Sequence, residues 1–417
     1  MTTFSELGLA EAILESLTKD DHKTPTPIQE EAIPKLLAGH DLLGIAQTGS
    51  GKTAAFTLPL LHQLYETPHK TQDLGPRALI LTPTRELAGQ VRERVAVYGA
   101  RTALRTGLVI GGVPINKQKK IIRRGIDILI ATPGRLEDLL KQDAVSLAGV
   151  EYFVLDEVDQ MLDMGFIRTI RSITAKLPKK RQSLFFSATM PSEIARLANA
   201  LLNNPVRIEL KRQPPPKIKQ SVDFLTKHEK LGALVKIAGD KTFTRGLVFS
   251  RTKYGADKIV KSLNRAGLAS QAIHGNRSQG QRERALKAFR RGDALILVAT
   301  DIAARGIDIQ GVSHVINFDL PNTPETYVHR IGRTARAGAA GIAISFCSPE
   351  ERAELRAIER LTGERFNGPN DKTGDARHTP KQPRKRRQKN KRNGLDAHAA
   401  INRKADETIA NLSFLAK

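Results

Sequence analysis

Cysteine, long apolar runs and acidic residues are all scarce in this 417-residue chain. Cys347 is the only cysteine, which excludes an intrachain disulfide and a cysteine-rich metal site, and we expect it to lie in a core. No stretch approaches the ~20 consecutive apolar residues that a membrane span needs. Residues 1–9 also lack the basic-then-apolar order of a signal peptide. These absences lead us to expect a soluble, cytoplasmic protein that is not embedded in a membrane.

The shortage of acidic residues leaves a large positive charge. The chain has 67 Lys+Arg against 43 Asp+Glu, a formal net charge of +24. That balance favours a polyanionic partner, either nucleic acid or an anionic membrane surface. Residues 371–417 hold 13 Lys/Arg against 5 acidic residues, concentrated in Lys381–Arg392. This segment has too little apolar surface to fold alone, so we expect a disordered basic arm that adds affinity for nucleic acid, with a merely solvating tail as the alternative.

Apolar runs divide the chain into two domains. Five runs separated by helical stretches predict the strands of one parallel α/β sheet: Leu42–Ala46, Ala78–Leu81, Ile126–Ala131, Tyr152–Leu155 and Ser183–Phe186. The same rhythm returns with Gly246–Phe249, Ala294–Ala299, His314–Phe318 and Gly341–Phe346. The prolines at 214–216 indicate a stiff connector between the two sets. We therefore expect an α/β protein with domains at 1–210 and 220–366, a linker at 211–219 and a tail at 367–417.

A phosphate-binding loop follows the first predicted strand and precedes an apolar helical run. It consists of Ala46, Gln47, Thr48, Gly49, Ser50, Gly51, Lys52 and Thr53. The glycines permit turns that aim backbone amides at phosphates, Lys52 adds a point charge, and Thr53 offers a ligand to Mg²⁺. A chance glycine-rich turn is the alternative, which the flanking strand and helix disfavour.

An acidic pair ends the apolar run at residues 152–155 and supplies the second half of an ATPase site. Asp156 would hold Mg²⁺, directly or through water, and Glu157 would orient and polarise the attacking water. Alone, the pair could be a surface acidic turn. Next to a phosphate loop it predicts hydrolysis of a nucleoside triphosphate.

With these motifs in place, residues 4–365 resemble a DEAD-box RNA helicase of superfamily 2, and among bacterial members the RhlE-like group is most similar. Besides the two motifs above, the family's segments occur in order at 25–29, 83–87, 111–112, 132–135, 187–189, 248–251, 279–282, 299–308 and 329–336. The resemblance implies two RecA-like domains, each a parallel sheet with helices on both faces. It also implies ATP and Mg²⁺ as cofactors and RNA as the partner.

The resemblance also assigns residues to the nucleotide. Gln29 would bind the adenine edge and favour ATP over GTP, Phe4 would pack near the base, and His22 occupies a position where the family usually has an aromatic that stacks on adenine. Asp308 would contact the ribose. Arg333 and Arg336 match the arginine fingers that the second domain presents to the γ-phosphate. Hydrolysis would then depend on closure of the two domains.

Coupling and RNA contacts are implied in the same way. Asp159, Ser187, Thr189 and His329 match the network that links hydrolysis to RNA. The RNA contacts would come from Pro83, Thr84, Arg85, Gly111, Gly112, Thr132, Pro133, Gly134 and Arg135 in the first domain and from Arg251, Gln279, Arg282 and Thr300 in the second. Backbone and phosphate contacts of this kind fix position without reading bases, so we expect unwinding without sequence preference.

Two residues depart from the family pattern. Val158 replaces the usual alanine between Glu157 and Asp159, and we expect tolerated packing with retained hydrolysis. Ala335 replaces a glycine between the two arginines, and we expect it to be compatible with helix. Two rival functions stay open, an ATP-gated RNA clamp with weak hydrolysis and a DNA helicase on the same fold. Ribosomal or RNA-decay proteins are candidate partners.

Overall fold

The computed structural model describes residues 2–47, 49–68, 75–210, 218–304, 311–335 and 340–366. Several expectations from the sequence fall on residues outside these ranges. They are Thr48 of the phosphate loop, Asp308, Arg336, most of the expected linker and the whole tail at 367–417.

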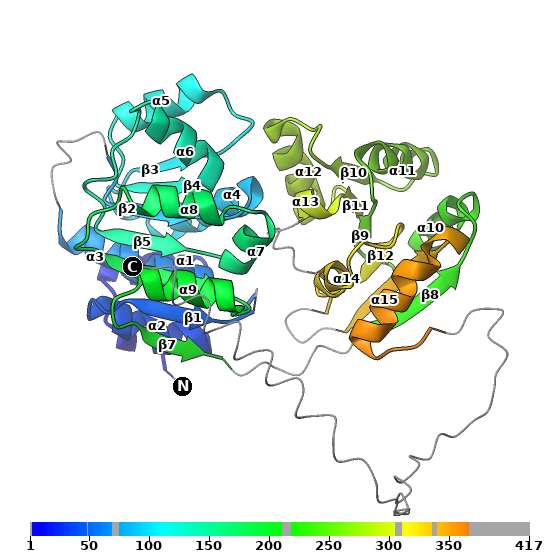
Figure 1. The fold of residues 1–417 in the computed structure, drawn as a ribbon, viewed down its shortest axis with the longest axis horizontal. Helices are drawn as coiled ribbons and strands as arrows, with labels where there is room; N and C mark the ends of the chain where they lie inside the picture. The colour runs from blue at the N-terminus through cyan, green and yellow to red at the C-terminus, as the bar shows by residue number, and fades with distance from the viewer. Residues whose placement is uncertain are drawn as a thin grey trace, which may run out of the picture. The chain divides into compact units, whose positions relative to one another are not determined.

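A seven-stranded parallel sheet forms the first lobe (Figure 1). Its strands are β1 (Leu42–Ile45), β2 (Ala78–Leu81), β3 (Thr106–Val109), β4 (Ile128–Ala131), β5 (Tyr152–Leu155), β6 (Gln182–Ser187) and β7 (Val206–Glu209). The helices are η1 (Phe4–Leu7), α1 (Glu11–Lys19), α2 (Pro27–Leu37), α3 (Lys52–Glu66), α4 (Arg85–Tyr98), α5 (Ile115–Arg123), α6 (Pro133–Lys141), α7 (Val158–Asp163), α8 (Ile167–Thr174) and α9 (Ser192–Leu201). The spatial order of the strands is β3-β4-β2-β5-β6-β1-β7.

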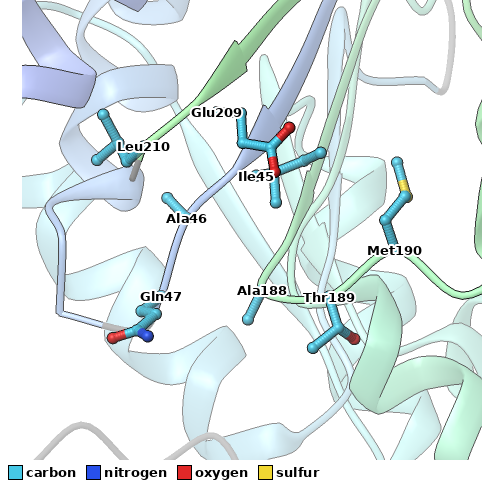
Figure 2. A pocket seen from close by; sticks show the side chains of 8 residues that line it. All are labelled: Ile45, Ala46, Gln47, Ala188, Thr189, Met190, Glu209 and Leu210. Atoms are coloured by element: carbon cyan, nitrogen blue, oxygen red, sulfur yellow. The ribbon is translucent and has the colours of Figure 1, made fainter. Parts of the chain in front are cut away.

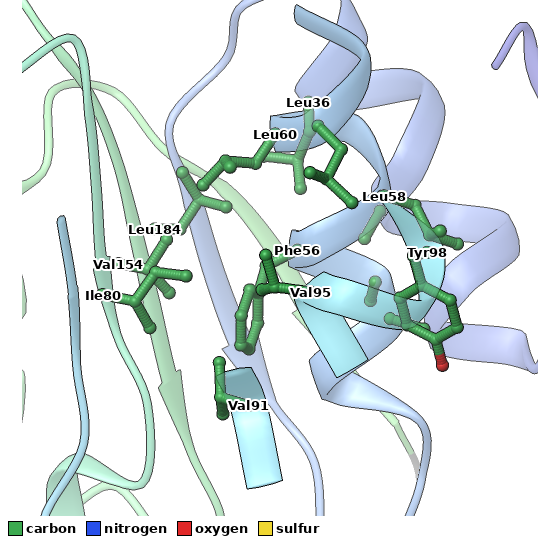
Figure 3. Packing of buried hydrophobic residues seen from close by; sticks show 14 of the residues in the cluster. Leu36, Phe56, Leu58, Leu60, Ile80, Val91, Val95, Tyr98, Val154 and Leu184 are labelled. Carbon is green, nitrogen blue, oxygen red and sulfur yellow. The ribbon is translucent and has the colours of Figure 1, made fainter. Parts of the chain in front are cut away.

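Helices cover both faces of this sheet because successive strand residues point to opposite sides. In β2, Ala78 and Ile80 pack into one core cluster, whereas Leu79 and Leu81 pack into the other. The first cluster includes residues of α1, α2, α3 and α4, and Figure 3 shows Phe56 of α3 and Val91 and Val95 of α4 facing the strands. The second cluster includes residues of α6, α7, α8 and α9. Every central strand is thereby buried on both sides.

A six-stranded parallel sheet forms the second lobe, in spatial order β10-β11-β9-β12-β13-β8. Its strands are β8 (Ile218–Phe224), β9 (Gly246–Phe249), β10 (Ser270–Ile273), β11 (Ile296–Ala299), β12 (His314–Asn317) and β13 (Gly341–Cys347). The helices are α10 (Glu229–Ala238), α11 (Lys253–Arg265), α12 (Gln279–Arg291), α13 (Asp301–Ala304), α14 (Pro324–Ile331), η2 (Pro349–Glu351) and α15 (Arg352–Thr362). Buried residues of α10 and α11 contact one face, and those of α12 and α13 contact the other.

The expected fold class is confirmed, and each of the nine predicted apolar runs overlaps a strand. Cys347 is 1% exposed, as expected of a core residue. The sequence missed four strands, β3, β7, β8 and β10, which are the four edges of the two sheets. Over the described ranges, no helix combines the length and apolar character that crossing a membrane requires.

Candidate functional site

The phosphate loop joins the carboxyl end of β1 to the first turn of α3. Gly49 and Gly51 have φ of 90° and 95°, in the left-handed region that a side chain disfavours. Lys52, the first residue of α3, is 6% exposed, and its Nζ donates to the carbonyl oxygen of Ala46 at 2.8 Å. The loop therefore curls around its own lysine, with the amino end of α3 behind it. An anion held here would meet backbone N–H groups and a cationic side chain.

Two polar side chains at the start of α2 donate hydrogen bonds to this loop. Thr26 Oγ1 donates to the carbonyl oxygen of Ser50 at 2.9 Å, and Gln29 Nε2 donates to that of Gly51 at 3.0 Å. Gln29 Oε1 accepts from the backbone N–H of Thr26 at 2.9 Å. A Cβ added to Gly51 would lie 2.5 Å from Gln29 Nε2, so only glycine lets the two elements approach this closely. Gln29, expected at the adenine, here also fixes the shape of the phosphate loop.

Asp156 and Glu157 follow β5, which pairs with β6, and β6 pairs in turn with β1. Asp156 is 2% exposed, and its Oδ1 has no hydrogen-bond partner among the described residues. Burial raises the pKa of Asp156 to about 7, opposed by the Lys52 charge and assisted by that of Glu157. A buried carboxylate oxygen without a partner fits a divalent cation, and the Thr53 hydroxyl in the first turn of α3 is a suitable second oxygen ligand.

Glu157 is buried at a backbone φ of 54°, an uncommon conformation for a residue with a side chain. Its Oε2 accepts from Gln160 Nε2 at 2.6 Å. The next residue, Val158, is fully buried and belongs to the core cluster on the α6–α9 side of the sheet. Its branched bulk thus packs into the core, as tolerated packing requires.

Asp159 connects the acidic motif to the end of β6. Its Oδ2 accepts from the backbone N–H groups of Ala188 and Thr189 at 3.1 and 3.0 Å and from Thr189 Oγ1 at 3.2 Å. Ser187 Oγ donates to the carbonyl oxygen of Thr189 at 2.7 Å. The structure therefore brings together three of the four residues expected to couple hydrolysis to RNA. The fourth, His329, is an exposed residue of α14 in the second lobe.

A hollow of about 490 Å³ lies between the phosphate loop and the segment after β6. Figure 2 shows Ala46 and Gln47 on one side and Ala188, Thr189 and Met190 on the other. We call the segments after β5, β6 and β1 the central loops. These loops carry the phosphate loop, the acidic pair and the Ser187–Thr189 segment, and only the first and the last of these line the hollow.

The segments after β3, β4 and β2, three adjacent strands, form a second group that we call the outer loops. Thr84 caps α4 by accepting from the N–H of Leu87 at 3.2 Å. Arg85 lies against Gly111 and Gly112, where an added Cβ would meet its guanidinium. Arg135 Nη1 donates to the carbonyl oxygen of Val113 at 2.7 Å. Pro83 and Pro133 are buried, Thr132 is the N-cap of α6 and Gly134 lies in its first turn.

The second lobe gathers its expected contacts at the ends of β10, β11 and β9, again three adjacent strands. Arg251 follows β9 and Thr300 follows β11. Gln279 and Arg282, in the first turn of α12, are 6% and 7% exposed. Gln279 Oε1 and Arg282 Nε have no hydrogen-bond partner within the described part of the chain. Arg333 is half-buried just beyond α14.

Phe4 and His22, which are expected near the adenine, contact other side chains of the first lobe. Phe4 is 4% exposed and packs into the core cluster with α1 and α2. His22 follows α1, and its ring meets that of Tyr98 edge-on, with 5.7 Å between centroids. The His22 side chain also lies 3.1 Å from Asp20.

Comparisons with known proteins agree with this arrangement. The DEAD/DEAH box helicase family model matches residues 26–197, and the model of the helicase conserved C-terminal domain matches residues 227–338. The DEAD-box ATP-dependent RNA helicase CshA of Bacillus cereus is 43% identical over 364 residues, which cover 87% of this chain and 68% of that protein. This chain belongs to the DEAD-box ATP-dependent RNA helicases. It is thus an RNA-dependent ATPase that uses ATP to remodel RNA.

Other members of the family are similar over the same span. The DEAD-box ATP-dependent RNA helicase RhpA of Helicobacter pylori is 42% identical and covers 86% of this chain and 72% of its own. Among solved structures, S. cerevisiae Dbp5 bound to RNA and ADP BeF3 superposes with a TM-score of 0.75 at 33% identity, covering 87% of this chain and 94% of its own. A DEAD box protein from Methanococcus jannaschii superposes with a TM-score of 0.52 at 38% identity, covering 88% and 98%.

Sequence reasoning missed Arg330, a residue of this helicase that connects elements of the second lobe. Arg330, next to His329, is 2% exposed and forms two bonds to Asp301, with Nε to Oδ1 at 2.6 Å and Nη2 to Oδ2 at 2.7 Å. Its Nη1 donates to Asn317 Oδ1 at 3.1 Å and to the carbonyl oxygen of Asp319 at 2.7 Å. Arg330 therefore ties α14 to α13 and to the end of β12. Asp301 lies in the motif at 299–308 and Arg330 in the motif at 329–336. Their opposite charges are the signal that could have indicated this ion pair.

One expectation about this helicase is wrong. Ala335 was expected to be compatible with helix, but α14 ends at Ile331 and Ala335 has a φ of 55°. The residue is 4% exposed and adopts the left-handed backbone that favours glycine. The family's glycine at this position thus has a conformational reason, and alanine here bears strain of about 1 kcal/mol.

Proposed function

We propose that this helicase couples hydrolysis of Mg²⁺-bound ATP to local, sequence-nonspecific opening of RNA duplexes and RNA–protein complexes. The observation that carries the proposal is the division of one sheet edge into central loops and outer loops. The central loops carry a buried acid and a phosphate loop, which suit hydrolysis. The outer loops carry backbone donors and two arginines, which suit a phosphodiester chain. Neighbouring strands can thus transmit a change at one group to the other.

In the nucleotide site, Lys52 and the loop amides would bind the phosphates, and Asp156 with Thr53 would hold Mg²⁺. The ion would neutralise charge on the β- and γ-phosphates. Glu157 would orient the attacking water, and Arg333 with Arg336 would donate to the γ-phosphate when the lobes close. Asp308 would bind the ribose, and Gln29, Phe4 and His22 would enclose the adenine. The buried Oδ1 of Asp156, which has no hydrogen-bond partner among the described residues, supports this assignment.

On the RNA side, the outer loops of the first lobe and Arg251, Gln279, Arg282 and Thr300 of the second would grip one strand. Closure driven by ATP and RNA would bend that strand so that a paired partner cannot stay stacked, and hydrolysis would reopen the lobes. Asp159, Ser187, Thr189 and His329 would link the two events. The hydrogen bonds from Thr189 and Ala188 to Asp159 support this role, because they join the acidic motif to its neighbouring strand.

The finer assignments belong to the same proposal. Residues 1–210 and 220–366 would be the two lobes, and the basic residues 367–417 would raise general RNA affinity in a salt-dependent way. The chain would belong to the RhlE-like group and work in the cytoplasm, with ribosomal or RNA-decay proteins as partners. Deleting residues 367–417 should weaken RNA binding and flatten its salt dependence while sparing turnover on saturating RNA. Unchanged affinity would exclude this role for the tail.

The deciding experiment compares wild type with Glu157→Gln in RNA-stimulated ATPase and duplex-unwinding assays. We expect the variant to bind RNA and ATP but to lose hydrolysis and unwinding, since the amide cannot polarise water. If wild type hydrolyses no more ATP with RNA than Glu157→Gln does, the protein is an ATP-gated clamp. Matched RNA and DNA strands in the same ATPase assay separate an RNA helicase from a DNA helicase.

A further inference from the structure

Arg251, an expected RNA contact, is held by a buried acid that lies 100 positions later in the chain. Arg251 Nη2 donates to Glu351 Oε1 at 3.1 Å and to the carbonyl oxygen of Leu320 at 3.1 Å. Its backbone N–H donates to Asp319 Oδ2 at 2.9 Å. Arg251 still exposes 42% of its side chain, whereas that of Glu351 exposes only 6%. The arginine is therefore anchored at one nitrogen and open to solvent elsewhere.

Glu351 is itself fixed by several donors. Its Oε2 accepts from Lys230 Nζ at 2.6 Å and from the N–H and Oγ of Ser348 at 3.1 and 3.0 Å. Its Oε1 also accepts from the N–H of Leu320 at 3.1 Å. Burial opposes ionisation, but these donors lower the pKa of Glu351, so its carboxylate stays charged. The acid cannot turn away from Arg251 without abandoning these bonds.

Lys230 completes the cluster on its far side. Its side chain is 2% exposed, and Nζ donates to the carbonyl oxygen of Phe318 at 2.8 Å and lies 3.7 Å from Asp319 Oδ1. Two cations and two carboxylates thus lie together at the ends of β9 and β12. A buried lysine without this compensation would be strongly destabilising, so Glu351 serves the fold and Arg251 at the same time.

We propose that Glu351 is a positioning residue, which aims the Arg251 guanidinium at an RNA phosphate. Both described side-chain contacts of Arg251 use Nη2, which leaves the N–H groups of Nε and Nη1 to donate to a phosphate. A free arginine loses side-chain conformational entropy when it is fixed. Glu351 removes part of that loss before RNA binds. The inference rests on the proposed role of Arg251 in RNA binding.

The test measures the affinity of the full-length chain for a fluorescent single-stranded RNA with a non-hydrolysable ATP analogue, and the RNA-dependent KM and kcat of ATP hydrolysis. Glu351→Gln should weaken RNA binding and raise the KM for RNA about 5- to 10-fold, with kcat unchanged. Glu350→Gln is the matched control, since its carboxylate is exposed and paired with Lys227 at 3.4 Å. It should leave RNA affinity within about 2-fold of wild type.

Arg251→Ala, alone and combined with Glu351→Gln, separates the possible failures. If Glu351 acts through Arg251, Glu351→Gln should add nothing in the Arg251→Ala background. Additive losses, or tighter binding by Glu351→Gln, would overturn the positioning role while leaving Arg251 as an RNA contact. Unchanged affinity of Arg251→Ala would refute the RNA contact itself. If Glu351→Gln folds poorly, the double variant Lys230→Met/Glu351→Gln replaces it, because this variant removes the buried cation together with the anion. Its RNA affinity is then compared with and without Arg251→Ala.

Discussion

The central loops and the outer loops of the first lobe share one sheet edge but differ in chemistry. The central loops place the Asp156 carboxylate, whose Oδ1 has no hydrogen-bond partner among the described residues, at the end of a buried strand and within reach of the Lys52 charge. The outer loops instead pack Arg85 onto Gly111 and Gly112. Hydrolysis needs buried charge that a substrate and a metal complete, whereas a backbone-binding surface needs donors and close approach. The fold supplies both by changing only the loop at the end of each strand.

The largest expected effect comes from Asp156→Asn. Removing the carboxylate should lower kcat for ATP at least about 100-fold, since the metal ligand is lost. Without metal and nucleotide, however, the variant should be more stable than wild type to denaturant, because burial disfavours the ionised Asp156 carboxylate more than the Lys52 charge favours it. ATPase assays and unfolding in the presence of a chelator measure the two effects.

The stability gain should depend on pH in a defined direction. Burial raises the pKa of Asp156 to about 7 in the folded protein, whereas the ordinary pKa of this group is 3.8. The free energy of unfolding of wild type should therefore fall as the pH rises from 3.8 toward 7. The gain from Asp156→Asn should therefore be larger at about pH 8 than at about pH 5. The control is Asp163→Asn, an exposed acid of α7. A gain that does not change with pH would contradict the buried charge at Asp156.

In the outer loops, Gly112→Ala should act on RNA rather than on ATP. Gly112 has a φ of 78°, and an added Cβ would meet the Arg85 guanidinium. Displacing Arg85 should raise the KM for RNA about tenfold, while the KM for ATP stays unchanged. Gly165→Ala is the control, because Gly165 has a φ of 75° but no atom within 4 Å of the added Cβ. If both variants behave alike, backbone strain alone explains the effect.

Val158→Ala tests whether the departure from the family pattern at this position affects stability or hydrolysis. Val158 is fully buried in the core cluster opposite α1–α4. Shortening it should lower the free energy of unfolding by about 2 kcal/mol through the cavity left behind. The kcat should stay within about 2-fold, since no atom of the site is removed. A several-fold gain in hydrolysis would instead mean that Val158 restrains Glu157 and would favour the clamp.

Sequence patterns predicted the central strands and missed the edges for a physical reason. Central strands such as β2 are covered on both faces, so they appear as uninterrupted apolar runs. Edge strands such as β3 and β7 are only partly buried and include Thr106, Arg207 and Glu209. Their short, mixed composition resembles that of a loop.

The functional residues divide in a similar way. Motifs indicated Lys52 and Asp156 as candidates because the proposed chemistry requires fixed residue types next to a strand. Glu351 escaped, since nothing in the sequence relates it to Arg251. Only the parallel pairing of β12 with β9 and with β13 brings the ends of these strands together. Arg330 escaped because its bond to Asp301 likewise joins two distant motifs.

Ala335→Gly should have the smallest effect. It removes a side chain at a positive φ, whereas Gly112→Ala adds one. The outer loops use glycine where φ is positive, whereas the segment after α14 places alanine at a φ of 55°. Glycine adopts this backbone freely, so relief of the strain should raise the free energy of unfolding by about 0.5–1 kcal/mol. The greater conformational entropy of glycine in the unfolded chain reduces this gain. The control is Ala353→Gly at an exposed position in α15, which should lose about the same amount. Thermal unfolding of both variants decides, and a loss at both positions would mean that packing of the Ala335 methyl group outweighs the strain.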